Sequence, residues 1–157
     1  MHSSEIPSGL FFGLAPWVVF FPVIGLLINL AIGRRLPEKL SGAIASVAAG
    51  LSFVVAALLA FSLTRYPEGT LVPLADWMTI GTLHIGWNFK VDTLSVLMML
   101  VVSLVGTLIH IYSIAYMHND VRLNEDPARF SRFFVYLNLF IAAMMILVSA
   151  DSYLMTF

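Results

Sequence analysis

Hydrophobic residues fill four long stretches of the chain, and no residue within them carries a formal charge. The stretches are 6–33, 40–64, 93–119 and 133–150, and they hold 28, 25, 27 and 18 residues. A hydrocarbon core about 30 Å thick is crossed by roughly 20 helical residues, so each stretch is a candidate span. The pattern predicts an all-α fold of polytopic transmembrane helices, with about four spans at 9–33, 40–64, 92–117 and 132–150.

The basic residues between the spans predict an orientation. Six of them lie in or beside the loops 34–39 and 118–131, whereas the loop 65–91 holds two. Membrane proteins keep their Lys- and Arg-rich loops in the cytoplasm. We therefore expect the N-terminus outside, the loops 34–39 and 118–131 in the cytoplasm, and the loop 65–91 on the outer surface.

The outer loop carries a strand pattern. Apolar and polar residues alternate strictly over 83–91, which is the period of a strand with one covered face. Residues 81–82 can form a turn, and the run 71–80 can pair with the strand, so we expect a short β-hairpin in this outer loop. Helix ends of this chain or a neighbouring subunit should cover the apolar face of the hairpin. That face consists of Leu83, Ile85, Trp87 and Phe89.

Composition and charge exclude several functional classes. Hydrophobic residues make up 60% of the chain and charged residues 11%, against about 25% charged in an average soluble domain. The net charge of -1 offers no basic field to nucleic acid, so we expect the lipid bilayer, and no nucleic acid, as a partner. The absence of cysteine excludes disulfides, thiolate nucleophiles and cysteine-bound metal clusters. One histidine deep in a span cannot hold a haem between two ligands, and we expect no cofactor and no metal on this chain.

The third span carries a polar stripe with one ionisable residue. Steps of three or four place Ser103, Gly106, Thr107, His110 and Ser113 on one helix face. An ionisable group inside a span is a functional candidate by default, and His110 with Ser113 and Thr107 is our candidate proton relay. A neutral histidine that only packs and bonds across helices is an equally open interpretation. In both cases we expect His110 to be buried, neutral and bonded to a hydroxyl or the backbone.

Two aspartates stand at the ends of membrane stretches, Asp92 before the third span and Asp151 after the fourth. We expect each to cap a helix or to lie at the interface rather than to carry protons. No glycine-rich phosphate loop and no nucleophile–base pair is visible in the sequence, so no soluble-type active site is expected.

Several sequence blocks resemble a known family. They read DTLS at 92–95, LIHIYSIAYM at 108–117, RFSRFFVYLNLF at 129–140 and LVSAD at 147–151. These blocks resemble the antiporter-like subunits of proton-pumping NADH:quinone oxidoreductase (respiratory complex I). Within that family they are most similar to the N-terminal part of chain L, which Trp17 and GRRLP at 33–37 also fit. The A subunit of multisubunit sodium/proton antiporters shares the pattern less closely and is the alternative.

The resemblance implies a membrane subunit of NADH:quinone oxidoreductase that takes part in proton translocation coupled to electron transport. In that family, inverted repeats of membrane helices carry the protons through a glutamate on the fifth helix and later lysines. Residues 1–157 would then be a single incomplete membrane domain reaching the start of a fifth helix. The implied partners are other membrane subunits of a respiratory complex, and the implied location is the cell inner (plasma) membrane. The loop RRLP at 34–37 favours a bacterial over a mitochondrial source. A truncated, non-catalytic scaffold fragment is the remaining alternative.

The orientation can be tested by labelling, because the chain has no cysteine of its own. Glu38→Cys and Glu68→Cys should lie on opposite sides of the membrane. An impermeant thiol reagent added outside should modify the cysteine at position 68 and spare the one at position 38. The reverse labelling pattern would show that the orientation is wrong.

Overall fold

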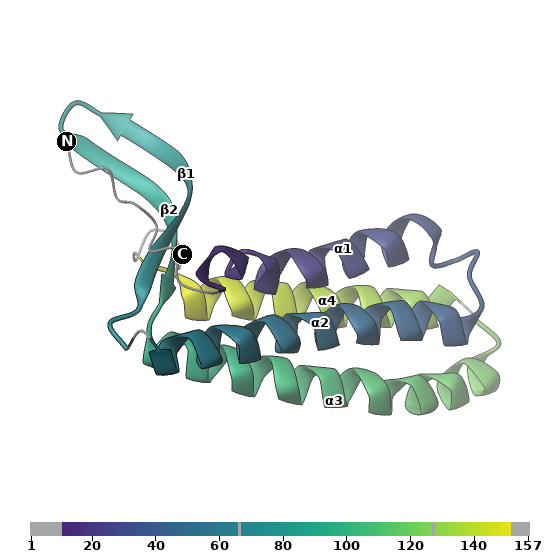
Figure 1. Cartoon of the computed structure of the whole chain (residues 1–157). Helices are drawn as coiled ribbons and strands as arrows, with labels where there is room; N and C mark the ends of the chain where they lie inside the picture. Colours follow the sequence, from purple (N-terminus) through teal and green to yellow (C-terminus); the bar gives the residue numbers. More distant parts are fainter. Residues whose placement is uncertain (1–10, 66, 127, 152–157) are drawn as a thin grey trace.

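The chain folds as a bundle of four long helices with a two-stranded hairpin at one end (Figure 1). The structure is a computed structural model and describes residues 11–65, 67–126 and 128–151. In chain order its elements are the short 3-10 helix η1 (Phe12–Leu14), helices α1 (Trp17–Ile32) and α2 (Glu38–Arg65), strands β1 (Thr70–Ile80) and β2 (Leu83–Val91), and helices α3 (Thr93–Asn124) and α4 (Ala128–Ser149). The predicted all-α fold with an added hairpin is confirmed. The expected start of a fifth helix falls at 152–157, outside the described residues.

Four helical segments are long and apolar enough to cross a membrane: Phe12–Ile32, Glu38–Arg65, Thr93–Asn124 and Ala128–Ser149. Helices α2, α3 and α4 continue beyond the expected spans at one end, so the connections there are shorter than the loops 34–39 and 118–131. The cost of a charge in hydrocarbon marks where a helix leaves the bilayer, not where the helix stops. Charged residues are good helix formers in water, and α3 therefore continues past Asp120 and Arg122.

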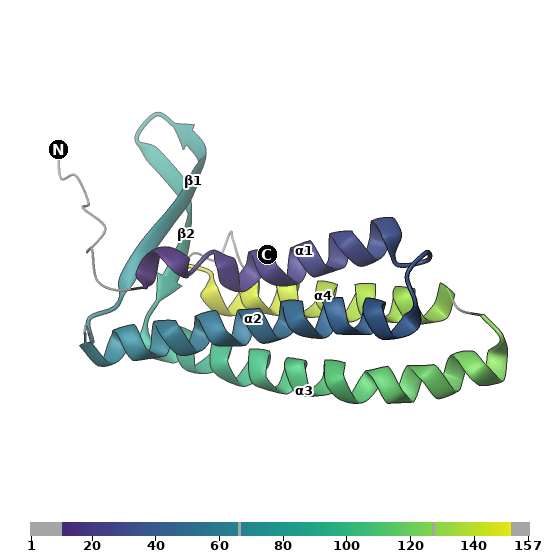
Figure 2. The same ribbon diagram turned by 45° about the vertical axis from the view of Figure 1, so that its right-hand side comes forward.

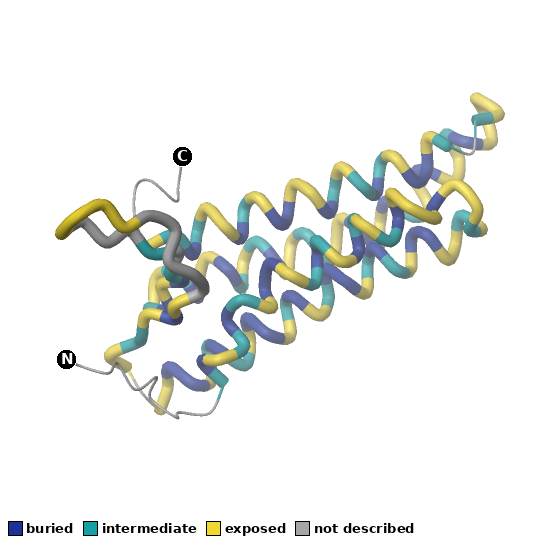
Figure 3. Tube along the Cα trace, turned by 90° about the horizontal axis from the view of Figure 1, so that it is seen from above, coloured by how far each residue is buried: buried dark blue, intermediate teal, exposed yellow. Residues whose placement is uncertain are grey.

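The helices pack around a seam of mostly small side chains on α2. Helix α2 contacts α1, α3 and α4, and α4 also contacts α1 and α3 (Figure 2). The buried positions of α2 recur at alternating steps of four and three, the spacing that favours left-handed packing of helices. Those on the seam are Ser41, Ala45, Ala48, Ser52, Val55, Leu59 and Ser62. Figure 3 shows buried positions recurring along each helix between exposed ones.

Two polar contacts connect α1 with α2 inside this packing. The Ser52 hydroxyl donates to the Val18 carbonyl at 2.6 Å. The Ser41 hydroxyl donates to Asn29 Oδ1 at 2.6 Å, and Asn29 Nδ2 donates back to the Ser41 carbonyl at 3.3 Å. Because neither lipid nor the bundle interior offers water, these bonds satisfy groups that would otherwise be costly to bury.

The predicted hairpin is formed by antiparallel pairing of β1 with β2. Thr70 lies opposite Val91 and Ile80 opposite Leu83, with two bulges in β1 that accommodate its two extra residues. The turn at 81–82 uses Gly81 at a φ of 62°, a conformation that glycine adopts without strain. Gly69, at a φ of 67°, is needed for a second reason, because a side chain there would collide with the Val91 carbonyl.

The base of the hairpin closes one end of the bundle. Val72, Phe89 and Val91 are buried in the same apolar cluster as Phe12 and Leu63. Phe89 also forms an isolated antiparallel bridge with Ala150, directly after α4. The expected cover of the apolar face by this chain's own helix ends is therefore observed at Phe89. The side chains of the other members, Leu83, Ile85 and Trp87, lie outside the described part of the structure.

Asp92 connects the hairpin to α3 as the N-cap of that helix, which confirms the capping interpretation. Its carboxylate accepts a hydrogen bond from the Ser95 backbone N–H at 2.8 Å and lies 3.4 Å from Lys90 Nζ. Partial burial by itself raises the pKa of Asp92, but the hydrogen bonds from Ser95 and the charge of Lys90 outweigh it, so this pKa lies below its ordinary value. The carboxylate therefore stabilises the fold above its unfolded-state pKa of about 3.9, and this contribution is lost as the pH falls through the lower folded-state pKa.

We expect Asp92→Ala to lower the free energy of unfolding by about 1 kcal/mol at neutral pH, the usual cost of a lost cap. Asp92→Asn keeps a capping oxygen and should lose only the charge contribution. Thermal unfolding in detergent should then show wild type above Asp92→Asn at pH 7, with a difference that shrinks as the pH falls below about 4 and vanishes below the lowered folded-state pKa. Glu68→Gln, at an exposed carboxylate of the same end, is the matched control. A difference between wild type and Asp92→Asn that does not change with pH would contradict the assignment.

Candidate functional site

His110 lies on the buried face of α3, in the interior of the bundle. Its side chain is completely buried, and its Nδ1 lies 2.7 Å from the Gly106 carbonyl oxygen. A carbonyl can only accept, so Nδ1 carries the hydrogen and Nε2 of the neutral ring is a bare acceptor. The expected burial and backbone partner are confirmed, whereas the relay role stays a prediction.

Asn138 of α4 is the residue that the polar stripe alone does not reveal. It is completely buried, and its amide lies close to the His110 ring without a hydrogen bond between the two side chains. A Cβ built at Gly25 of α1 would lie 3.1 Å from Asn138 Nδ2 and 2.6 Å from Ala48 Cβ of α2. All four helices therefore meet here. Asn138 of α4, beside His110 of α3, lies next to Gly25 of α1 and Ala48 of α2, which are small enough to leave room.

The pair differs from the other buried polar side chains in its hydrogen bonding. Within the described residues, three buried side-chain nitrogen or oxygen atoms have no hydrogen-bond partner, and they are His110 Nε2, Asn138 Nδ2 and Asn138 Oδ1. Unpaired polar atoms in an interior cost about 1–3 kcal/mol each, so structures rarely keep them without a role. Here they are concentrated in two neighbouring side chains of complementary chemistry.

Both residues lie at the same depth in the predicted membrane. The middles of the uncharged stretches 93–119 and 133–150 fall at Gly106 and Ile141, and a Cβ on Gly106 would meet the Ile141 side chain. His110 lies four residues and Asn138 three residues from these middles, on the side of the basic loops, which is about 5–6 Å of helix. This similar distance from the middles of the two stretches is the sequence signal from which the proximity of His110 and Asn138 could have been predicted.

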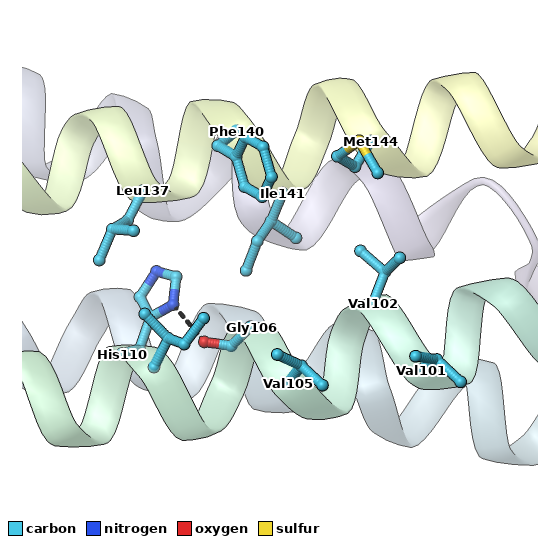
Figure 4. A pocket seen from close by; sticks show the side chains of 10 residues that line it. Val101, Val102, Val105, Gly106, His110, Leu137, Phe140, Ile141 and Met144 are labelled. Carbon is cyan, nitrogen blue, oxygen red and sulfur yellow. Dashed lines mark hydrogen bonds between the residues drawn. The ribbon is translucent and has the colours of Figure 1, made fainter.

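An apolar pocket reaches His110 from the side of the bundle (Figure 4). It has a volume of about 340 Å³ and lies between α3 and α4, with residues of both helices as its walls. Ile141 and Leu137 of α4 project toward His110 and Gly106 of α3, and the dashed line in the figure marks the Nδ1 bond to Gly106. Apart from the imidazole its lining side chains are apolar, which suits a lipid chain or a neighbouring helix rather than a polar substrate.

The structure does not join the other two candidate relay residues to His110. Thr107 is half-buried, and its hydroxyl donates to the Ser103 carbonyl of its own helix at 2.7 Å. Ser113 is buried on the same face as His110. In the described residues no hydrogen bond joins these three side chains. Thr107 bonds the carbonyl four residues back, as threonine in a helix readily does, and His110 Nδ1 bonds Gly106.

The remaining candidates fall outside the bundle centre. Asp92 caps α3, and Asp151 is exposed beyond the end of α4. Among the residues that the structure describes, no group of three or more His, Asp or Glu side chains could hold a metal ion. The absence of a cofactor stays a prediction.

The chain is similar to one family of known proteins. The family described as NADH-ubiquinone oxidoreductase (complex I), chain 5 N-terminus, matches residues 77–134. NADH-quinone oxidoreductase subunit L of Escherichia coli (strain K12) is 38% identical over 141 residues, which are 88% of this chain and 22% of that protein. Subunit L of Mycobacterium tuberculosis (strain CDC 1551 / Oshkosh) is 40% identical over 89% of this chain and 21% of its own length. NADH-ubiquinone oxidoreductase chain 5 of Aspergillus niger is 33% identical, over 89% of this chain and 20% of its own length.

This chain corresponds to the N-terminal part of the subunit L family. It spans about a fifth of the length of the curated relatives that it matches. The names of these relatives, with the four apolar helices, support a multi-pass membrane protein. They also favour complex I over the sodium/proton antiporter that the sequence left as an alternative.

The close approach at Gly25 yields a matched pair of variants. Gly25→Ala should lower the free energy of unfolding by about 1–3 kcal/mol, because its Cβ would overlap Ala48 and press on Asn138. Gly50→Ala should be neutral or slightly stabilising, since the nearest atom, Thr107 Cγ2, is 3.8 Å from the added Cβ and alanine is the better helix former. Thermal unfolding of both proteins in the same detergent checks this. Equal stabilities would show that the Gly25 contact is not tight.

Proposed function

We propose that this chain is part of a membrane subunit of NADH:quinone oxidoreductase that takes part in proton translocation coupled to electron transport. The observation that carries the proposal is the completely buried His110–Asn138 pair, in a chain whose relatives are named as complex I subunits. In this proposal the chain's contribution is one proton-accepting step inside the membrane. No redox or nucleotide site is assigned to it.

The chemistry of that step follows from the two side chains. With Nδ1–H bonded to Gly106, the neutral ring can take a proton at Nε2. The amide of Asn138 can donate from Nδ2 to the bare nitrogen, and after a turn of the amide Oδ1 can accept from the protonated one. A single residue can thus stabilise both protonation states of His110, which lowers the cost of a charge at this depth.

The step needs neighbours on both sides to become a path. Protons crossing about 30 Å of hydrocarbon require further titratable groups or ordered water. Thr107 and Ser113 offer hydroxyls on the same helix face, but the four spans contain no Lys, Arg or Glu at mid-depth. By resemblance, the glutamate and lysines of the family continue the path, within a complex of other membrane subunits.

The surroundings of the bundle support a membrane-embedded, multi-subunit setting. Large apolar side chains are exposed on every helix, among them Leu30 at 64%, Leu94 at 68% and Phe140 at 59%. Such a surface is stable only against lipid or other apolar helices. We propose the inner (plasma) membrane with the N-terminus outside, as the basic loops indicate. The bacterial assignment rests on the loop at 34–37 alone.

Replacement of His110 tests the relay. In the assembled complex, His110→Ala should markedly reduce the protons pumped per NADH oxidised and leave NADH oxidation by an artificial acceptor intact. Asn138→Leu, which removes the partner amide, should lower pumping in the same direction. Ser62→Ala is the control, because this α2 hydroxyl bonds its own helix and is not one of the candidate relay residues. Unchanged pumping in both His110→Ala and Asn138→Leu would favour a packing role, and a scaffold function for this part of the subunit.

A further inference from the structure

The end of the bundle opposite the hairpin, which we call the basic end, contains two hollows that share a wall. One lies between α3 and α4 and the other between α1 and α4, and each has a volume of about 510 Å³. Arg132 and Tyr136 of α4 line both. The other polar residues of the first hollow are Arg129, Asp120 and Tyr116. Those of the second are Arg34, Arg35, Asn29 and Ser131.

The charges around these hollows do not balance. Arg129 lies 3.6 Å from Asp120, and Arg132 lies 3.2 Å from Asp126. For Arg34 and Arg35 no carboxylate lies within ion-pair distance in the described residues. Four arginines therefore meet two carboxylates, both of which are partly exposed and weakly bound. The excess of positive charge is greatest between α1 and α4.

The position of the second hollow relates it to the membrane surface. It lies where α1 ends at Ile32 and α4 begins at Ala128. Tyr136, 66% exposed, is a residue type enriched where hydrocarbon meets water. One turn deeper on the same two helices, Leu27 and Leu139 are exposed at 54% and 52%. A charged site is thus continuous with an apolar surface that runs into the bilayer.

We propose that Arg34, Arg35 and Arg132 bind the phosphate group of an anionic phospholipid, whose acyl chains lie along the outer faces of α1 and α4. Guanidinium groups bind phosphate oxygens through paired hydrogen bonds, and basic hollows between membrane helices suit anionic head groups. Tyr136 adds a hydroxyl donor to the same wall. A soluble phosphate shares the head-group chemistry but has no use for the apolar surface below it.

Lipid competition in nanodiscs of the full chain tests the site. The probes are spin-labelled phosphatidylglycerol and phosphatidylcholine, and the quantity measured is their relative affinity for the protein. Wild type should prefer phosphatidylglycerol, and Arg34→Gln/Arg35→Gln should reduce the preference about fivefold per arginine removed. Arg34→Lys/Arg35→Lys keeps the charge and should retain most of it, which separates binding from any change in folding.

A second double variant is the matched control. Lys39→Gln/Arg122→Gln removes two charges from the same end of the bundle but from outside both hollows. It should change the preference little. An equal loss in both Gln double variants would overturn the proposal, because it would show only a general surface field. Displacement of the lipid by inorganic phosphate, beyond that by chloride at equal ionic strength, would overturn it in favour of a soluble anion.

Discussion

The centre of the bundle depends on the close approach of α1 to α2 and α4 at Gly25. Because this position has no side chain, Ala48 and the Asn138 amide both occupy space next to the α1 backbone. In a bilayer, apolar surface alone does not draw helices together, since lipid is equally apolar. Helices associate there through close backbone contact over small residues. The same contact that packs α1 therefore makes room for the one buried amide on α4.

The buried polar groups of the bundle fall into two kinds. The hydroxyls of Ser62, Ser103 and Ser149 donate to the carbonyl four residues back, and Asn29 is paired with Ser41. These groups are satisfied within one helix or between two neighbouring helices and need nothing further. His110 and Asn138 are of the other kind, with atoms that can bind a proton or a donor without breaking an existing bond. Because both keep unpaired polar atoms, His110 and Asn138 are, within the described residues, the buried side chains that can take part in proton chemistry.

The sequence predicted the features that strong, local energies impose. The cost of a charge in hydrocarbon predicted the four spans, and the period of two with a turn at Gly81 predicted the hairpin. Weaker or collective effects were missed. The helices continue into water beyond their spans, which shortens both connections at the basic end. The contact between His110 and Asn138 depends on how α3 and α4 rotate about their axes, and Thr107 turned to its own helix. Packing between helices decides such rotations, and the polar stripe of α3 does not show which residue of α4 will face it.

The Asn29–Ser41 bonds bear on the order in which the bundle assembles during synthesis. Their two residues are only 12 positions apart, and they join α1 to the helix that follows it directly. The first helical pair can therefore satisfy its most polar buried side chain before the rest of the protein has left the ribosome. Asn138 packs against Gly25, far earlier in the chain, so its environment forms only after α4 has entered the membrane. A preformed α1–α2 pair would thus serve as the template on which the later helices dock, and the His110–Asn138 region would be the last part of the bundle to close.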